Sequence, residues 1–177
     1  MESSLTFISA HPEFAEIFCE YRQDSITRQY NPLMPSTIEE LRERLSRASS
    51  NWDDFQNNSV TSFMWFVKCG DEIVGNVNLN AVNHMMLTAE IGYGVFPHAR
   101  KKGIATKMVQ CFTSEVFLKT SLRKIMAYVH EDNLASRRVM EKSGYLQEGI
   151  LREHYIVNGK PANEVIYGIL RHEVLIR

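Results

Sequence analysis

The segment AEIGYGVFPHARKKGIA, residues 89–105, constrains what this chain can fold into more than any other. A β-rich run with two glycines leads into the pattern Arg-x-x-Gly-x-Ala, and apolar residues then recur at the spacing of one helix face. A glycine turn that opens a helix gathers unpaired backbone N–H groups at the positive end of the helix dipole, which is what a pyrophosphate needs. The predicted anion cradle consists of Arg100, Lys101, Lys102, Gly103, Ile104 and Ala105.

The strand before the cradle indicates which anionic ligand the segment would bind. Two glycines within a strand mark a bulge or a close approach by another backbone, so a peptide-like ligand can pair there. Pantetheine is such a ligand, because its two amides mimic a short peptide. The dinucleotide pattern Gly-x-Gly-x-x-Gly and the nucleoside triphosphate pattern Gly-x-x-x-x-Gly-Lys-Ser/Thr do not occur as cradles here. The segment therefore favours coenzyme A, with Tyr93, Gly94 and Val95 along its pantetheine arm.

Two later blocks follow the cradle in a fixed order. They read NLASRRVMEKSGYLQEG at residues 133–149 and LREHYIVNGKPANEVIYGIL at residues 151–170. With the cradle, the first block resembles the acetyl-CoA-binding motifs of the GNAT N-acetyltransferases. The second block is similar to the branch of that family that acetylates the N-termini of ribosomal proteins. The resemblance covers roughly residues 60–170, whereas residues 1–60 agree only in general layout.

The pattern of the whole chain predicts one α/β domain. Residues 1–60 carry a short strand at 5–8, helical segments at 11–30 and a helix from Ser36 or Thr37 to about Trp52. Strands follow at 63–68, 73–79, 124–130, 145–156 and 165–170, with helices from 104 to about 119 and at 132–143. The resemblance implies a mixed, mostly antiparallel GNAT-like sheet with a splayed, bulged strand and helices on both faces. It assigns residues 1–60 to the acceptor side and residues 61–177 to the acetyl-CoA-binding core of a single domain, 1–177.

Composition excludes several classes of protein. The 177 residues are 44% hydrophobic, without an apolar run long enough for a membrane span and without the pattern of a signal peptide. The three cysteines form no metal-binding spacing, so no metal is expected, and a cytoplasmic location fits best. Residues 1–60 hold ten acidic residues against five arginines, and residues 61–177 hold eleven against fifteen basic ones. This asymmetry is compatible with an acidic acceptor groove or with solvated helix faces, and nucleic-acid binding is not expected.

The acceptor amine requires a mild base. An α-amine has a pKa near 8, so roughly a tenth of it is neutral at pH 7 and a carboxylate acting through water suffices. Glu90, at the start of the glycine-containing strand, is the leading candidate, as a family position that often holds such a group. Glu153 and His154 are the alternatives. A backbone N–H near Val95 is expected to polarise the thioester carbonyl.

The leaving thiolate is where the sequence departs from the family. Many members carry a tyrosine seven residues after the motif asparagine, but Met140 stands there and cannot donate a proton. Ser136 offers a hydroxyl near the start of the same helix and is predicted to assist the thiolate. Asn133 is predicted to cap that helix and to contact the pantetheine arm.

Other reactive side chains have simpler interpretations. Tyr145 and Tyr167 are expected to be core aromatics, and Cys111 is expected to lie on the buried face of its helix. Arg137, Arg138 and Lys142 form a predicted solvated helix face, with a ribose phosphate contact open to one of them.

The resulting prediction is an acetyl-CoA-dependent N-acetyltransferase that acts by direct attack within a ternary complex. The resemblance favours a protein or peptide N-terminus, such as that of a ribosomal protein, as the primary amine acceptor. The first alternative is an N-acetyltransferase whose acceptor is a polyamine, an aminoglycoside or an amino acid. The second alternative is a non-catalytic acyl-CoA-binding module. The partners are coenzyme A and the amine acceptor, without a membrane, and a homodimer is common in the branch.

Overall fold

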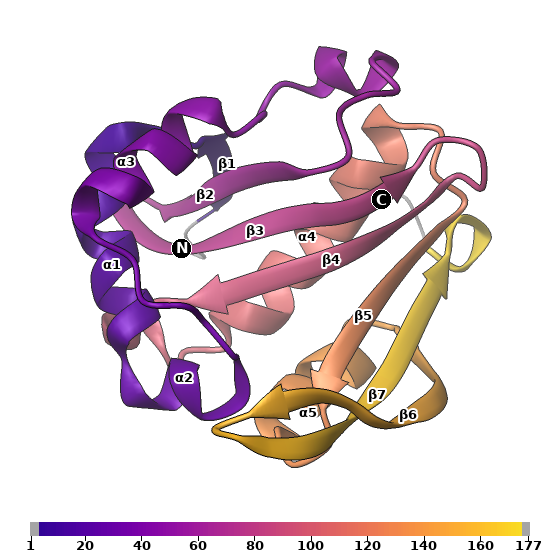
Figure 1. Cartoon of the computed structure of the whole chain (residues 1–177). Coiled ribbons are helices and arrows are strands. Elements are labelled where there is room, and N and C mark those ends of the chain that lie inside the picture. The colour runs from indigo at the N-terminus through magenta and orange to yellow at the C-terminus, as the bar shows by residue number, and fades with distance from the viewer. Residues whose placement is uncertain (1–3, 175–177) are drawn as a thin grey trace.

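A seven-stranded mixed sheet runs through the molecule in the order β1-β2-β3-β4-β5-β7-β6 (Figure 1). The computed structural model describes residues 4–174 of the chain. Its strands are β1 Leu5–Ser9, β2 Phe63–Cys69, β3 Glu72–Asn83, β4 Thr88–Val95, β5 Lys124–His130, β6 Leu146–Val157 and β7 Lys160–Leu170. The mixed, mostly antiparallel sheet predicted from the sequence is confirmed.

The junction of β4 with β5 opens the sheet. Every other neighbouring pair is antiparallel, but β4 and β5 are parallel and pair only over Thr88–Glu90 and Lys124–Met126. Beyond Glu90 the two strands diverge, which Figure 1 shows as a wedge between them. Backbone groups of β4 along the wedge are left without a partner strand on that side, so this is where a peptide-like ligand can pair.

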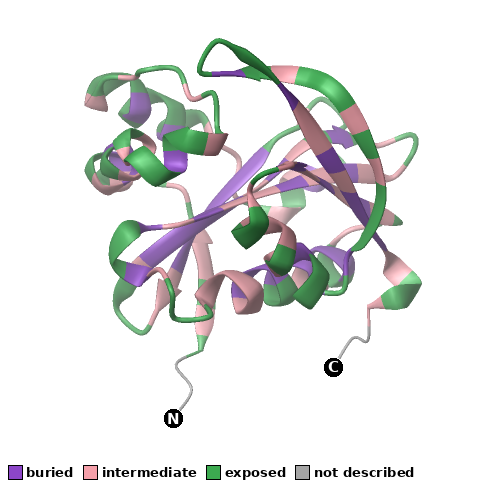
Figure 2. Ribbon diagram, turned by 90° about the horizontal axis from the view of Figure 1, so that it is seen from below, coloured by how far each residue is buried: buried purple, intermediate pink, exposed green. Residues whose placement is uncertain are grey.

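Helices cover both faces of the sheet (Figure 2). Helices α1 Ala15–Gln23, α2 Ser25–Tyr30 and α3 Ile38–Arg47 come from the N-terminal third, and α4 Ile104–Lys119 and α5 Leu134–Lys142 come from the later part. Short 3-10 turns at Pro12–Phe14, Trp52–Gln56, Pro97–Ala99 and Arg171–Glu173 complete the order. Within residues 4–174, no helix has the length and apolar content needed to cross a bilayer.

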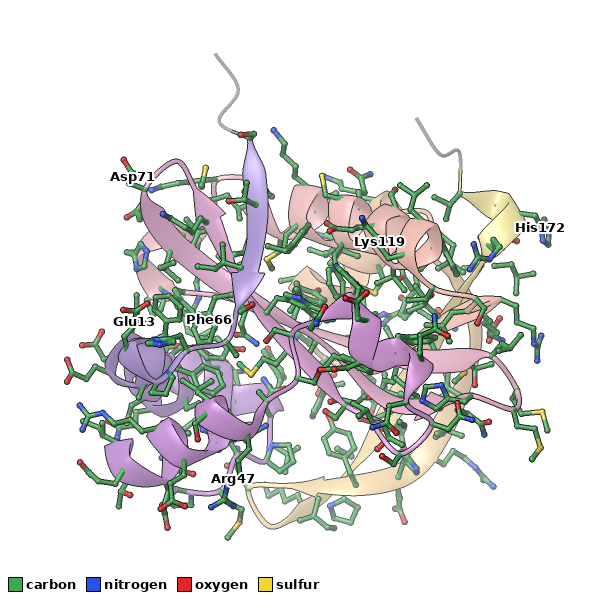
Figure 3. All side chains as sticks on the ribbon, turned by 90° about the horizontal axis from the view of Figure 1, so that it is seen from above. Glu13, Arg47, Phe66, Asp71, Lys119 and His172 are labelled. Carbon is green, nitrogen blue, oxygen red and sulfur yellow. The ribbon has the colours of Figure 1, made fainter. Side chains whose placement is uncertain are left out.

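Strand β2 separates two apolar cores. Its even-numbered residues Met64 and Phe66 pack with α1 and α3, whereas Trp65 and Val67 pack with α4 and the remaining strands. All four are nearly inaccessible to solvent, because successive side chains of a strand point to opposite faces and both faces are covered. Figure 3 shows Phe66 beside the N-terminal helices, with charged residues such as Arg47 at the periphery.

Helix α3 ends earlier than the sequence suggested. Thr37 caps it through a capping box with Glu40, as the Ser/Thr signal predicted, but the helix stops at Arg47 and not near Trp52. The reason is tertiary: the Ser50 hydroxyl bonds Ala10 N and Met64 O, and its carbonyl accepts a bond from the Trp65 indole. These bonds tie the segment after α3 to β1 and β2, and a continued helix would break them.

Candidate active site

The wedge between β4 and β5 contains a cavity of about 920 Å³. It is bounded by β4, β5, the start of α5, helix α2 and residues of the β6–β7 hairpin. Most predicted site residues line it, and they come from segments far apart in the chain. They are Glu90, Tyr93, Gly94, Val95, Arg100, Ala105, Asn133 and Ser136.

The turn before α4 has the form expected of an anion cradle. Gly103 is the N-cap residue with φ +74°, and no side chain caps the helix. A Cβ at Gly103 would meet nothing within 4 Å, so the approach to the first N–H groups of α4 is open. Lys101, with φ +62°, and Lys102 are exposed beside it. The residues present therefore suit the pyrophosphate of coenzyme A.

Arg100 is held by the N-terminal helices. Its guanidinium lies 2.7 Å from an Asp24 carboxylate oxygen and 2.9 Å from the Thr27 hydroxyl, and its Nε donates to Val95 O at 3.2 Å. The Arg100 hydrogen bond is the main reason that the pKa of Asp24 lies below its usual value. Because Asp24 balances the charge of Arg100, the unpaired positive charge at the cradle comes from the exposed lysines. A contact from Arg100 to a phosphate stays a prediction.

Gly92 and Gly94 of β4 leave space for the side chains of Asn78 and Tyr21. They do not mark a bulge. A Cβ at Gly92 would come within 2.6 Å of the Asn78 side chain, and one at Gly94 would collide with the Tyr21 hydroxyl. The register shift between β3 and β4 falls between Asn80 and Asn83, away from both glycines. The expectation that the glycines mark a bulge is therefore wrong in its position, while the splay of β4 is present.

Two carboxylates line the cleft, and one of them pairs with an imidazole. Glu90 and Glu164 both line the cavity, and the Glu164 carboxylate lies 2.5 Å from His154 Nδ1. Burial, followed by the nearby charge of Glu164, raises the pKa of Glu90, and His154 opposes that shift. Glu164 was not predicted, because it belongs to no recognised motif and lines the cleft only through the pairing of β7 with β5.

Glu153, the first alternative base, does not reach the cleft. It lies in an irregular part of β6 with φ +49°, its side chain is exposed and its N–H donates to Asn163 Oδ1. It lines a separate surface hollow with residues 150–152. The register shift between Leu151 and Tyr155 turns this stretch outward, so simple strand alternation misplaces it.

A hydroxyl group at the start of α5 pairs with one from β4 in the cleft. Asn133 caps the helix, with its Oδ1 accepting from Ser136 N at 3.1 Å. The Ser136 hydroxyl lies 2.7 Å from the Tyr93 hydroxyl of β4. Burial raises the pKa of Tyr93 to about 12, so its phenol is neutral at physiological pH. The pairing was not predicted, because the two residues are 43 positions apart.

The remaining candidates take structural positions. Tyr145 is buried and shares a hydrogen bond with Thr113, and the buried Tyr167 hydroxyl bonds Glu141 and Arg137. Met140 is completely buried. The prediction for Cys111 is wrong: it is exposed, because the buried face of α4 is formed by residues such as Met108, Val109 and Phe112.

The arrangement suits acyl transfer to an amine. The splayed strand β4, a pair of hydroxyl groups and two carboxylates line the cleft, and the first turn of α4 borders it through Ala105. Such groups can bind an anionic carrier, donate hydrogen bonds where a thiolate develops and accept a proton from an amine.

Known proteins share this fold and sequence pattern. Residues 5–146 match the family described as the acetyltransferase (GNAT) domain. YoaA of Bacillus subtilis (strain 168), an uncharacterized N-acetyltransferase, is 27% identical over 157 residues, which cover 88% of this chain and 86% of the relative.

Two solved structures, both under 25% identical, share the fold. The spermidine N-acetyltransferase of Vibrio cholerae, in complex with CoA and spermine, gives a TM-score of 0.83 at 20% identity over 97% of this chain and 98% of that chain. RimL, a ribosomal L7/L12 alpha-N-protein acetyltransferase in complex with coenzyme A, gives a TM-score of 0.82 at 19% identity, over 95% of this chain and 94% of that chain. Because the family match extends over most of the sequence, the chain belongs to the GNAT acetyltransferase family.

Proposed function

We propose that this acetyl-CoA-dependent N-acetyltransferase transfers the acetyl group to the primary amine at the N-terminus of a peptide or protein. The observation that carries the proposal is the pair of carboxylates, Glu90 and Glu164, in the same cleft as the Tyr93–Ser136 hydroxyl pair. Relatives and neighbours include both spermidine and ribosomal-protein acetyltransferases, so family membership alone leaves the acceptor open. The likeness of residues 151–170 to the ribosomal-protein branch supports the N-terminus.

Acetyl-CoA supplies an acetyl group already activated as a thioester. Residues 101–105 would hold its pyrophosphate through backbone N–H groups and the two lysines. Tyr93, Gly94 and Val95 would border its pantetheine arm along the unpaired edge of β4, with Asn133 and Ser136 opposite. In this proposal residues 61–177 form the acetyl-CoA side of the domain, and residues 1–60 cover the acceptor side.

Glu90 is proposed to accept the amine proton, directly or through water. Its raised pKa brings it closer to that of an α-amine, which makes proton transfer easier than to an ordinary carboxylate. Burial is the main cause of the raised pKa of Glu90, the charge of Glu164 adds to it, and His154 opposes it. Glu164 and His154 form an ion pair with each other.

The Tyr93–Ser136 pair is proposed to stabilise the departing thiolate. A coenzyme A thiol should resemble that of cysteine, with a pKa near 8.5, so it needs hydrogen bonds more than a strong acid. Ser136 can donate to the sulfur while it accepts from Tyr93, and the N-terminus of α5 adds a favourable dipole. In many relatives a tyrosine stands at the position of Met140 and assists the thiolate. In this proposal Ser136 and Tyr93 assist it instead.

A panel of acceptors tests the proposal. The full chain with acetyl-CoA would be offered peptides with a free N-terminus, the same peptides with an acetylated N-terminus, spermidine, an aminoglycoside and a free amino acid, with thiol release as the readout. Turnover with free but not blocked peptides is expected. A clear preference for spermidine would assign the alternative acceptor, and coenzyme A binding without turnover of any amine would indicate a non-catalytic module.

A further inference from the structure

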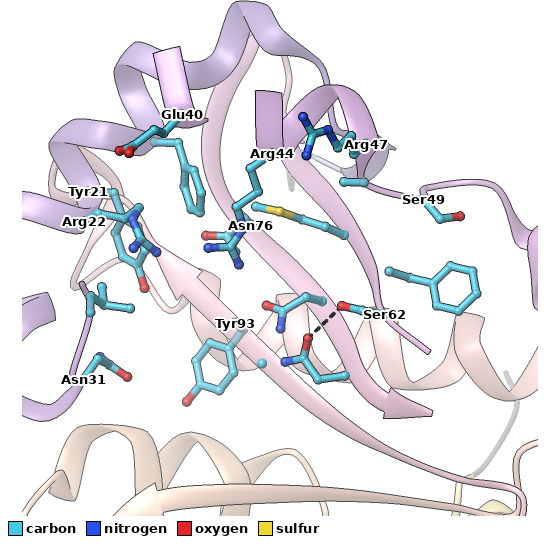
Figure 4. A pocket seen from close by; sticks show the side chains of 18 of the residues that line it. Tyr21, Arg22, Asn31, Glu40, Arg44, Arg47, Ser49, Ser62, Asn76 and Tyr93 are labelled. Atoms are coloured by element: carbon cyan, nitrogen blue, oxygen red, sulfur yellow. Dashed lines mark hydrogen bonds between the residues drawn. The ribbon is translucent and has the colours of Figure 1, made fainter. Parts of the chain in front are cut away.

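A second cavity of about 670 Å³ lies between helices α1 and α3 and the sheet surface of β2, β3 and β4 (Figure 4). It adjoins the acetyl-transfer cleft, because Tyr21, Asn31, Gly92 and Tyr93 line both. Of the residues that the mechanism above uses, Tyr93 alone lines this cavity. Its walls also carry polar side chains that have no role in that mechanism.

Three asparagines form the floor of the cavity. Asn76, Asn78 and Asn80 alternate along β3, so all three face the same side of the sheet, and Asn80 lies opposite Glu90 in the neighbouring strand. The row therefore begins beside the proposed base and leads away from it for about 13 Å, the length of roughly four residues of extended chain. Same-facing groups of an extended peptide repeat at the spacing of these asparagines.

Two buried polar atoms in this cavity lack a partner. Asn76 is 6% exposed, and its Oδ1 accepts no hydrogen bond from the described residues. The Nε of Arg22, on the helix wall above, donates none within the same residues. Leaving a buried donor or acceptor unpaired destabilises a fold, and an apolar residue at position 76 would avoid this cost. An acceptor and a donor thus remain available for a ligand.

Arginines outnumber glutamates among the helix residues that line the cavity, with Arg22, Arg44 and Arg47 against Glu40 and Glu43. Glu40 bonds the Thr37 backbone N–H in the capping box, and Glu43 pairs with Arg47. Arg22 and Arg44 have no ion pair within residues 4–174, and the charge of Arg44 adds to burial in lowering the pKa of Arg22. Figure 4 shows Arg44 reaching from α3 toward Asn76, with Tyr21 and Arg22 on another wall.

We propose that this cavity is the subsite for the first residues of a peptide acceptor, and that it selects a peptide with a carboxylate near its amine. The peptide amides would bond the asparagine row, with an N–H donating to Asn76 Oδ1. The carboxylate would accept from Arg22 and Arg44. This inference rests on the proposed N-terminal acetylation and names its substrate class. A polyamine lacks both features, and its distant ammonium groups would meet two arginines.

The carboxylate has two sources with the same chemistry. It is either an acidic side chain in the first few residues of a longer chain or the carboxyl terminus of a short peptide. Peptides with a free N-terminus and an amidated C-terminus, carrying Glu, Gln or Lys at the second, third or fourth residue, test the first source. A tripeptide compared with its C-terminal amide tests the second.

The wild-type chain should prefer the acidic peptide over its Gln counterpart by about tenfold or more in kcat/KM, the strength of one hydrogen bond to a charged group. The Lys peptide should be the poorest. In Arg44→Gln the preference should shrink, because only Arg22 then remains to bind the carboxylate. Arg42→Gln is the matched control, because Arg42 lies on the same helix, pairs with Glu16 and Glu39 and does not line the cavity.

Asn76→Leu separates ligand recognition from folding. Removing a buried amide whose oxygen has no partner should raise the unfolding temperature, while KM for the peptide rises several-fold and KM for acetyl-CoA keeps its wild-type value. A purely structural Asn76 would instead lower the unfolding temperature and leave the peptide KM unchanged, and that result would overturn the assignment of Asn76.

Failure of this inference differs from failure of the proposed function. If acidic and Gln peptides are acetylated equally well and Arg44→Gln behaves like Arg42→Gln, the subsite is refuted while N-terminal acetylation stands. If no peptide is acetylated and spermidine is, both fail together.

Discussion

At the scale of single residues, the structure combines hydroxyl groups that the sequence separates. The Ser136 and Tyr93 hydroxyls are 2.7 Å apart at the cleft, whereas Met140 is buried in the core. A hydrogen bond to sulfur strengthens only as negative charge develops on it, so the pair should act on the transition state more than on binding.

Ser136→Ala should therefore lower kcat by roughly 10–100-fold, the strength of a hydrogen bond to a charged group, with little change in acetyl-CoA affinity. Tyr93→Phe should lower kcat less, because Tyr93 acts through the serine. Steady-state kinetics and calorimetry of acetyl-CoA binding measure the two effects. Wild-type kcat in Ser136→Ala, with chemistry rate-limiting, would mean that the thiolate leaves unaided.

Glu90 offers a prediction in pH dependence. A base must be ionised to work, and its raised pKa places the acid limb of kcat/KM at a higher pH than an ordinary glutamate would. Glu164→Gln removes a charge that raises this pKa, so the acid limb should move to lower pH. Glu90→Gln should lose about 10²–10⁴ in rate near neutral pH, and the loss should shrink as the amine deprotonates itself. A small, pH-independent effect of Glu90→Gln, with a large one in Glu164→Gln, would transfer the role to Glu164.

At the scale of elements, the backbone conformation of the turn before α4 is predicted to decide coenzyme A binding. Gly103 has φ +74° and Gly70, in the β2–β3 turn, has φ +64°, and a Cβ at either would meet nothing within 4 Å. The two positions therefore have the same left-handed backbone conformation and the same free space around an added Cβ. Of the two, only Gly103 lies at a helix N-terminus.

Gly103→Val and Gly70→Val should lose similar stability, roughly 1–2 kcal/mol for an L residue in the left-handed region. Only Gly103→Val should bind coenzyme A at least tenfold more weakly, because its side chain keeps the phosphates from the N–H groups of α4. Thermal unfolding and calorimetry separate the two effects. Equal coenzyme A affinity in both variants would refute the cradle.

At the scale of the whole molecule, one ion pair joins the N-terminal helices to the cradle. Asp24 caps α2 through Thr27 N and also bonds Arg100, with both side chains about four-fifths buried. The depressed pKa of Asp24 means that the pair stabilises the fold above the ordinary carboxyl pKa of about 3.9, and that this contribution disappears as pH falls through the folded value.

Asp24→Asn should be less stable than wild type at pH 7, and the difference should narrow as the pH falls below about 4. Asparagine caps a helix as well as aspartate does, so the change isolates the ion pair. Unfolding by denaturant across this pH range measures it, with the exposed Asp53→Asn as control. A difference that is constant with pH would indicate that lost packing, and not charge, is responsible.

Local patterns in the sequence were sufficient to predict most of the helices and strands. The period of apolar residues predicted β5 and the Met108, Phe112 and Val116 face of α4, and Thr37 and Asn133 cap their helices as their residue types indicated. These features depend on neighbours within a few positions, and the free energy that decides them is local. The cradle at Gly103 belongs to the same class, because its conformation is set by one turn.

Only the tertiary structure decided which side chains meet. The charge effect of Glu164 on Glu90, the Tyr93–Ser136 contact and the Ser50 bonds that follow the early end of α3 all join segments far apart in the chain. Strand register determines them, and a shift such as that between Leu151 and Tyr155 turns Glu153 away from the cleft without any local signal. The sequence by itself therefore determined most elements and the open helix N-terminus at Gly103, whereas register and packing of the sheet determined which side chains share the cleft with Glu90.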